Sequence, residues 1–152
     1  MSEISIKVDG VAQKVAADQK PTHLFAEQKE IVVCRVNGEL KDLWTDLNEG
    51  DVVEGVSISS PDGLNVLRHS TAHVMAQAVQ QVFSQTRLGI GPPIKDGFYY
   101  DFDVIDPFAP ENLKQIEKEM ERIIRSGQRF IRRVTNDSDA KTELSHEPYK
   151  LE

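Results

Sequence analysis

Two histidines four residues apart are the first feature of this sequence that could do chemistry. His69 and His73 lie in a stretch, residues 67–83, whose apolar residues recur at helical spacing, which predicts an amphipathic helix. Residues four apart on a helix share one face, so the two imidazoles should lie side by side. Such a pair can bind a metal ion, transfer a proton or orient a water molecule. It can equally be two half-exposed histidines without a chemical role.

A metal site built on these residues alone would be incomplete. His69 and His73 supply two ligands, whereas structural zinc takes four protein ligands, so we expect no tightly held zinc. A zincin helix is excluded because Ser70, rather than a glutamate, follows the first histidine. Cys34 is the only cysteine, so no internal disulfide can form. It lies in a predicted strand and is expected to be a buried, unreactive side chain.

Length and composition predict one domain or two small ones. The chain has 152 residues, of which 39% are hydrophobic and 28% charged. The net charge of −7 argues against a protein that simply coats nucleic acid. One local basic patch, five arginines between Arg122 and Arg133 with no acid among them, could contact phosphates. No apolar signal segment or membrane-spanning run is present, so we expect no membrane partner.

The first sixty residues have the element order of a β-grasp domain, which is ubiquitin-like. Asp9-Gly10 and Asn37-Gly38 each predict a tight hairpin turn. Thr22 is expected to cap a short helix that runs through Gln28. The predicted strands cover residues 2–8, 11–15, 31–36, 39–43 and 51–58.

A turn-rich junction, residues 59–63, predicts a domain boundary, with domains at 1–60 and 61–152. After the histidine helix, Asp96-Gly97 predicts a turn, and aromatic and acidic residues then alternate between two strand faces. Gly89 and Gly91 lack side chains, so a ligand or another backbone could approach closely. Further elements are expected at 110–126 (helix), 128–134 (strand), from Asp137 or Ser138 to 144 (helix) and from 148 (strand).

Two motifs in the second region resemble the bacterial threonyl-tRNA synthetases. They are R-H-S-T-A-H at residues 68–73 and I-G-P-P-I-K-D-G-F-Y-Y-D at residues 90–101. The resemblance covers the whole chain: residues 1–60 resemble the TGS domain, and residues 61–152 resemble the first part of the editing domain. It implies an α+β fold, in which the β-grasp domain is followed by a domain with a long histidine-bearing helix and an antiparallel sheet.

The resemblance implies a site that hydrolyses serine mischarged on threonine tRNA. The family's catalytic histidines match His69 and His73, and a family lysine matches Lys150. His69 or His73 would activate water, Lys150 would stabilise developing charge, and Tyr100 and Gly91 would contact the substrate. Which histidine is the general base stays open.

The resemblance also implies a larger protein. The family's Cys-x-x-x-His element and its catalytic core have no counterpart, so the chain resembles an N-terminal fragment that would be inactive alone. The full-length family is a cytoplasmic homodimer through that core, which uses ATP, Mg²⁺ and Zn²⁺, and it binds the 3′ acceptor end of threonine tRNA. The fragment itself is expected to bind no cofactor. Two alternatives are a non-catalytic RNA- or protein-binding TGS module and a metal-dependent deacylase.

Overall fold

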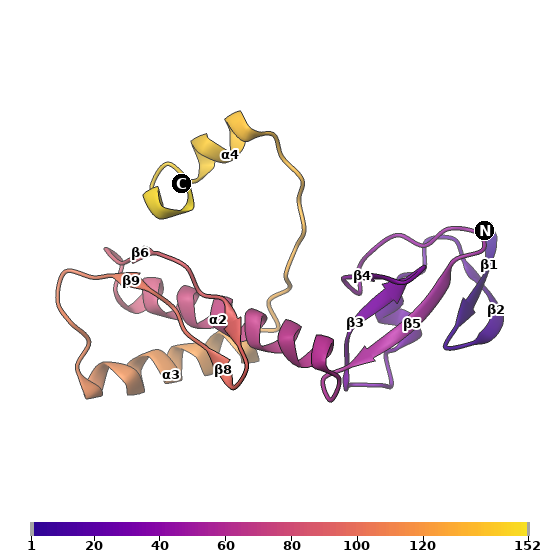
Figure 1. The fold of residues 1–152 in the computed structure, drawn as a ribbon, viewed down its shortest axis with the longest axis horizontal. Coiled ribbons are helices and arrows are strands. Elements are labelled where there is room, and N and C mark those ends of the chain that lie inside the picture. Colours follow the sequence, from indigo (N-terminus) through magenta and orange to yellow (C-terminus); the bar gives the residue numbers. More distant parts are fainter. Residues whose placement is uncertain (1, 152) are drawn as a thin grey trace. The chain divides into compact units, whose positions relative to one another are not determined.

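Helices and small sheets alternate along an α+β chain, which confirms the predicted fold class (Figure 1). The computed structural model describes residues 2–151. The chain divides into two compact units, one ending at Leu67 and the other beginning at Arg68. The helix α2 (Pro61–Val82) contributes residues to both units.

A five-stranded mixed sheet forms the first unit. Its strand order is β2-β1-β5-β3-β4, in which β1 and β5 are parallel and the other neighbours antiparallel. A short helix lies between the two hairpins, so the observed order is the one predicted for a β-grasp domain. The elements are β1 (Glu3–Val8), β2 (Val11–Ala16), α1 (Pro21–Leu24), β3 (Ile31–Val36), β4 (Glu39–Lys41) and β5 (Val52–Ser57).

Both predicted hairpin turns are confirmed by their backbone angles. Asp9 and Gly10 have φ values of 46° and 86°, and Asn37 and Gly38 have φ values of 53° and 85°. Two successive residues at positive φ form the type I′ turn, whose twist matches that of the flanking strands. The turns therefore fix the register of the hairpins β1–β2 and β3–β4.

The core of this unit is small and apolar, and Cys34 belongs to it. Val53 and Cys34 are fully buried, and Phe25 from the end of α1 packs with them. Burial, followed by the negative charge of Asp42, raises the pKa of the Cys34 thiol to about 11. Cys34 is therefore a buried small side chain rather than a reactive thiol, as expected.

Helix α1 is shorter than predicted and starts one residue before the predicted cap. Its N-cap is Lys20 rather than Thr22, and the helix ends at Leu24 rather than Gln28. Pro21 at the first helical position has the fixed φ that suits a helix start. His23 Nδ1 accepts a hydrogen bond from the Lys20 backbone N–H at 3.2 Å, which satisfies one of the free donors there.

The second unit combines helices with two-stranded antiparallel ladders. Strand β6 pairs with β9, and β7 pairs with β8. No helix within residues 2–151 is long and apolar enough to cross a membrane. Besides α2, the elements are β6 (Arg87–Leu88), β7 (Pro93–Ile94), β8 (Gly97–Phe98), β9 (Phe102–Asp103), α3 (Pro110–Arg125), α4 (Asp137–Glu143) and the 3₁₀ turn η1 (Pro148–Lys150).

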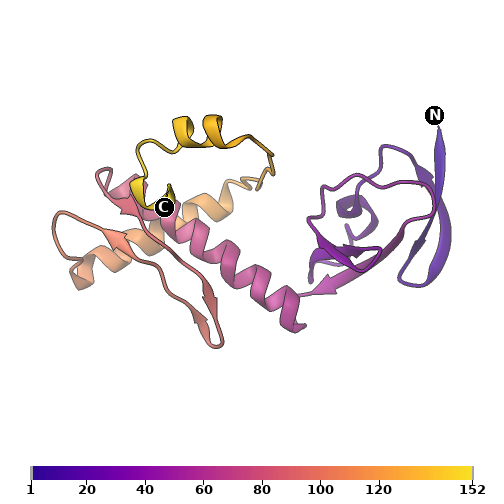
Figure 2. The ribbon, with the colours of Figure 1, turned by 45° about the horizontal axis from the view of Figure 1, so that its top comes forward.

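Helices α2 and α3 lie side by side and share one apolar core (Figures 1 and 2). Ala78 and Val79 of α2 are buried together with Ile116 and Ile123 of α3. Phe102 of β9 packs against this core, so the short strands are attached to the helix pair by an aromatic contact. The packing fixes the rotation of α2 about its axis.

Helix α2 begins six residues before the predicted start. The Ser60 hydroxyl accepts a hydrogen bond from the Gly63 backbone N–H at 3.1 Å, and Pro61 occupies the first helical position. A serine cap followed by proline is a strong helix start. The residues interpreted as a turn-rich junction therefore end one element and start the next, and the units divide later, after Leu67.

Two predicted strands near the end of the chain are wrong. Residues 128–134 form no strand, and Phe130, Ile131 and Val134 are 63%, 87% and 79% exposed. A strand needs a partner for its backbone groups, and no other strand among residues 2–151 pairs with this segment. Residues 148–150 form η1 instead of a strand, because the Lys150 N–H donates to the Glu147 carbonyl within one turn.

Two smaller predictions are corrected by local hydrogen bonds. Helix α4 is capped by Asn136, whose side chain accepts from the Asp139 backbone N–H at 2.9 Å, rather than by Asp137 or Ser138. In the hairpin β7–β8, Ile94 pairs with Gly97, so the turn consists of Lys95 and Asp96 rather than Asp96-Gly97.

We predict that Gly63→Ala destabilises the first unit. An added Cβ would lie 2.0 Å from the Ser57 carbonyl oxygen, so β5 and α2 would have to separate locally. Overpacking of this kind costs about 1–3 kcal/mol, although alanine is otherwise the better helix former by about 1 kcal/mol. Urea unfolding followed by circular dichroism measures the change. Asn65→Ala, an exposed position on the same helix, is the control and should not destabilise; equal stability of both variants would contradict the prediction.

Candidate functional site

One open cavity of about 370 Å³ brings together all the site residues predicted from the sequence. Its walls come from helix α2, from the segment between β6 and β7, from Tyr100 just before β9, and from η1. The lining residues are His69, His73, Ile90, Gly91, Pro92, Tyr100 and Lys150.

The two histidines contact each other directly. His69 Nε2 and His73 Nε2 are 2.8 Å apart, and the ring centroids are separated by 4.7 Å. At this distance one ring must donate and the other accept, so at least one imidazole is neutral at Nε2. The pair therefore holds a proton that can move between the rings or to a third group.

The charged form of the His73 ring is disfavoured. Partial burial, and after it the positive charges of His69 and Lys150, lowers the pKa of His73 below its ordinary value of 6.5. At neutral pH the imidazole of His73 is therefore largely unprotonated. A neutral imidazole that faces a cavity can accept a proton from water.

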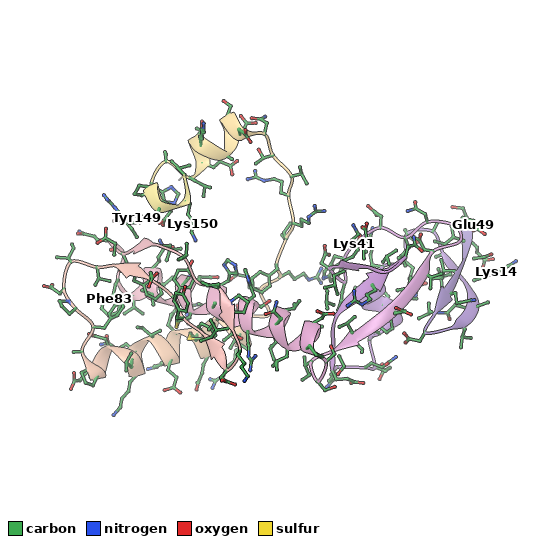
Figure 3. All side chains as sticks on the ribbon, viewed as in Figure 1. Lys14, Lys41, Glu49, Phe83, Tyr149 and Lys150 are labelled. Atoms are coloured by element: carbon green, nitrogen blue, oxygen red, sulfur yellow. The ribbon has the colours of Figure 1, made fainter. Side chains whose placement is uncertain are left out.

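Lys150 reaches the cavity from η1. Its Nζ donates hydrogen bonds to the Gly89 carbonyl at 2.7 Å and to the Tyr100 hydroxyl at 3.3 Å. Figure 3 shows the Tyr149 and Lys150 side chains extending from η1. The ammonium group also lies 5.5 Å from the centroid of the Tyr100 ring, within cation–π distance. A positive group fixed beside two histidines can stabilise a developing negative charge.

Tyr100 lies directly against the backbone of Gly91. A Cβ at Gly91 would meet the Tyr100 ring carbon Cδ2 at 2.1 Å, so only glycine permits the observed approach. On another side Tyr100 stacks on Phe102, with centroids 4.8 Å apart and the planes 17° apart. Because Phe102 packs on the helix core, the aromatic wall of the cavity is fixed by that core. The group that approaches Gly91 closely is therefore the Tyr100 side chain, whereas the sequence had suggested a ligand or another backbone segment.

Three residues that the sequence did not single out as site residues lie beside the predicted ones. Arg68 donates to the Ile94 and Lys95 carbonyls at 3.3 Å and 2.6 Å, which attaches the turn between β7 and β8 to α2. Phe130 packs edge-on to His73, with centroids 6.5 Å apart. Glu147, which is 5% exposed, lies three residues before Lys150. Arg68 stands next to the histidine motif, whereas nothing in the sequence marks Phe130 or Glu147.

The predicted basic patch is largely neutralised by its own helix and its neighbours. Arg122 pairs with Glu119, Arg125 with Glu121, and Arg133 with Glu143. Exposed ion pairs of this kind contribute little to stability, yet they reduce the charge available to a phosphate. Among residues 2–151, no group of three or more potential ligand side chains could hold a metal ion.

The chain is strongly similar in sequence to threonine–tRNA ligases from several organisms. The chain is 58% identical over 150 residues to Threonine–tRNA ligase of Pseudarthrobacter chlorophenolicus, which covers 99% of this chain and 22% of the relative. It is 56% identical over 151 residues to that of Bifidobacterium animalis subsp. lactis, again 99% of the chain and 22% of the relative. With that of Leifsonia xyli subsp. xyli it shares 64% over 128 residues, 84% of the chain and 18% of the relative. The chain matches no protein-family model.

These matches place the chain in the class of aminoacyl-tRNA synthetases. Within that class, the chain belongs to the threonine–tRNA ligase family. It spans about a fifth of the length of the curated relatives it matches.

We predict that the pKa of His73 rises when Lys150 is replaced by methionine. The substitution removes one of the positive charges that disfavour the protonated ring. Because the folded pKa of His73 is lowered, its contribution to stability is present above the unfolded value of about 6.5 and is lost as pH falls from there through the lowered value. An NMR titration of the imidazole signals measures the pKa, and urea unfolding at a series of pH values measures the change in stability. Lys141→Met, outside the cavity, is the control; an unchanged His73 midpoint in Lys150→Met would contradict the prediction.

Proposed function

We propose that this chain forms part of the editing site of a threonine–tRNA ligase. In this proposal, the cavity hydrolyses the ester that joins serine to the 3′ end of threonine tRNA. One observation carries it: a hydrogen-bonded histidine pair, a lysine ammonium group and an aromatic wall line a single cavity of about 370 Å³. The family to which the chain belongs supplies the substrate class.

The need for such a site follows from the chemistry of the two amino acids. Serine lacks one methyl group of threonine, and a pocket distinguishes a missing methyl group by only about 1–3 kcal/mol. A pocket that admits threonine therefore also admits serine at an appreciable rate. A second site that removes the wrong product restores the accuracy that binding alone cannot supply.

Each cavity residue has a role in the proposed hydrolysis. Neutral His73 takes a proton from a water molecule as its oxygen attacks the ester carbonyl. The Lys150 ammonium group stabilises the negative charge that develops on the carbonyl oxygen. The ester bond then breaks, and the leaving ribose oxygen receives the proton from the histidine pair. Tyr100 and Gly91 shape the wall against which the aminoacyl group binds.

The remaining activity belongs to the whole ligase and is likewise a proposal. Charging of tRNA with threonine would use ATP and Mg²⁺ in a catalytic core that also binds Zn²⁺ and forms a homodimer in the cytoplasm. No ligands for Mg²⁺ or Zn²⁺ are assigned, since no cluster of three or more side chains among residues 2–151 could hold a metal ion. The partner of the cavity would be the acceptor end of threonine tRNA.

We predict that His73→Ala in a full-length threonine–tRNA ligase containing this region weakens editing selectively. Loss of a positioned acid–base group lowers a rate about 10²–10⁴-fold. Deacylation of preformed seryl-tRNA should fall by this factor, whereas threonine charging and melting temperature should stay nearly unchanged. His23→Ala, which removes a histidine outside the cavity, is the matched control.

Other outcomes decide between the alternatives. A parallel fall of deacylation, charging and stability would make His73 structural. Intact deacylation in His73→Ala would show that His73 is not essential to editing. No deacylation by the wild type would instead favour a non-catalytic RNA- or protein-binding module.

A further inference from the structure

We propose that Glu147 is a positioning residue that docks η1 and thereby holds Lys150 in the cavity. The inference rests on the proposed editing function for its catalytic consequence, but its structural part can be tested separately. Within residues 128–151, Glu147 is the one side chain classed as buried, and it is 5% exposed. The C-terminal segment is therefore attached through an acidic residue rather than through an apolar core.

Both carboxylate oxygens of Glu147 are used. Oε1 accepts a hydrogen bond from the Gln80 side chain of α2, and Oε2 accepts one from the Leu88 backbone N–H of β6 at 2.8 Å. Gln80 also donates to the Thr86 carbonyl at 3.2 Å, which fixes the orientation of its amide. A buried carboxylate is stable only when such partners replace water. Glu147 therefore joins three segments, α2, β6 and η1.

The path from Glu147 to Lys150 is short and rigid. The Lys150 N–H donates to the Glu147 carbonyl at 2.9 Å, and Pro148 restricts the backbone between them. The two ends of this turn contact successive residues: Glu147 binds the N–H of Leu88, and Lys150 Nζ binds the carbonyl of Gly89. The position of the ammonium group is therefore set by where Glu147 docks.

The rest of the C-terminal segment offers few alternative anchors. Helix α4 has no buried residue. Tyr149 provides a second contact, through its hydroxyl to the Asp103 carboxylate at 3.1 Å, but its side chain is partly open to solvent. Without the Glu147 contacts, the hydrogen bonds of the Tyr149 and Lys150 side chains would remain, but both residues are exposed and such bonds are weak against competing water. Lys150 would then spend less time beside Tyr100 and the histidines.

Glu147→Gln tests the inference with almost no change in size. The new amide nitrogen is a donor, so it must face either the Gln80 amide or the Leu88 N–H, both of which are donors. Loss of a hydrogen bond to a charged group should speed exchange of the Leu88 amide about tenfold or more. The Lys150 ammonium group should also react faster with a water-soluble acetylating ester. Its acetylation rate, measured by mass spectrometry and divided by that of Lys141, should rise several-fold.

Controls separate positioning from a general loss of structure. Glu143→Gln is the same substitution four residues earlier on an exposed ion pair, and it should leave both rates at their wild-type values. Exchange of the Val79 amide, in the α2–α3 core, should not change in Glu147→Gln. Gln80→Ala removes one of the two donors and should give an intermediate effect. Unchanged Leu88 and Lys150 rates, or an equal rise at Val79, would overturn the inference.

The catalytic consequence is measured in a full-length threonine–tRNA ligase containing this region. Glu147→Gln should lower kcat for seryl-tRNA deacylation and leave KM and threonine charging nearly unchanged, since Lys150 acts on charge that develops only in the transition state. If the wild-type ligase does not deacylate seryl-tRNA, the proposed function fails, while a Lys150 that is released in Glu147→Gln still supports the docking role. If deacylation is intact in Glu147→Gln although Lys150 is released, the catalytic part of the inference is wrong.

Discussion

The packing of α2 against α3 is the constraint on which the rest of the cavity depends. Burial of Ala78 and Val79 against Ile116 and Ile123 fixes how α2 is rotated, and so fixes where His69 and His73 point. The same helix also carries the groups that hold the other walls. Arg68 binds the turn between β7 and β8, and Gln80 binds Glu147. One helix thus places the histidine pair and the segments that face it.

The charges within the cavity allow His73 to act as a base while the neighbouring Lys150 stays a cation. The histidine rings share one proton between their Nε2 atoms, and Lys150 adds a positive charge nearby. Both effects, after burial, disfavour a charged His73 and lower its pKa. A base beside a fixed cation is the combination that ester hydrolysis needs, because one group takes the proton while the other stabilises the oxyanion.

Local signals predicted the fold well, and long-range contacts explain where prediction failed. The Asp9-Gly10 and Asn37-Gly38 turns form as predicted because positive φ is a property of those dipeptides. Residues 128–134 include Phe130, Ile131 and Val134, residue types that favour a strand, yet a strand also requires a partner, which a local pattern does not contain. The resemblance brought Tyr100, Gly91 and Lys150 into the candidate site, and all three line the cavity. Glu147 was missed because one glutamate has no periodic signal, and its burial depends on contacts 59 and 67 residues away.

Recognition of an aminoacylated 3′ end that carries serine is the proposed task of this cavity. It can be tested by NMR titration of the chain with adenosine that carries serine through a 3′ amide, a stable substitute for the ester. We expect shifts at His69, His73, Tyr100 and Lys150, at lower ligand concentration for the serine compound than for adenosine alone. Shifts confined to residues outside the cavity, or equal responses to both compounds, would contradict it.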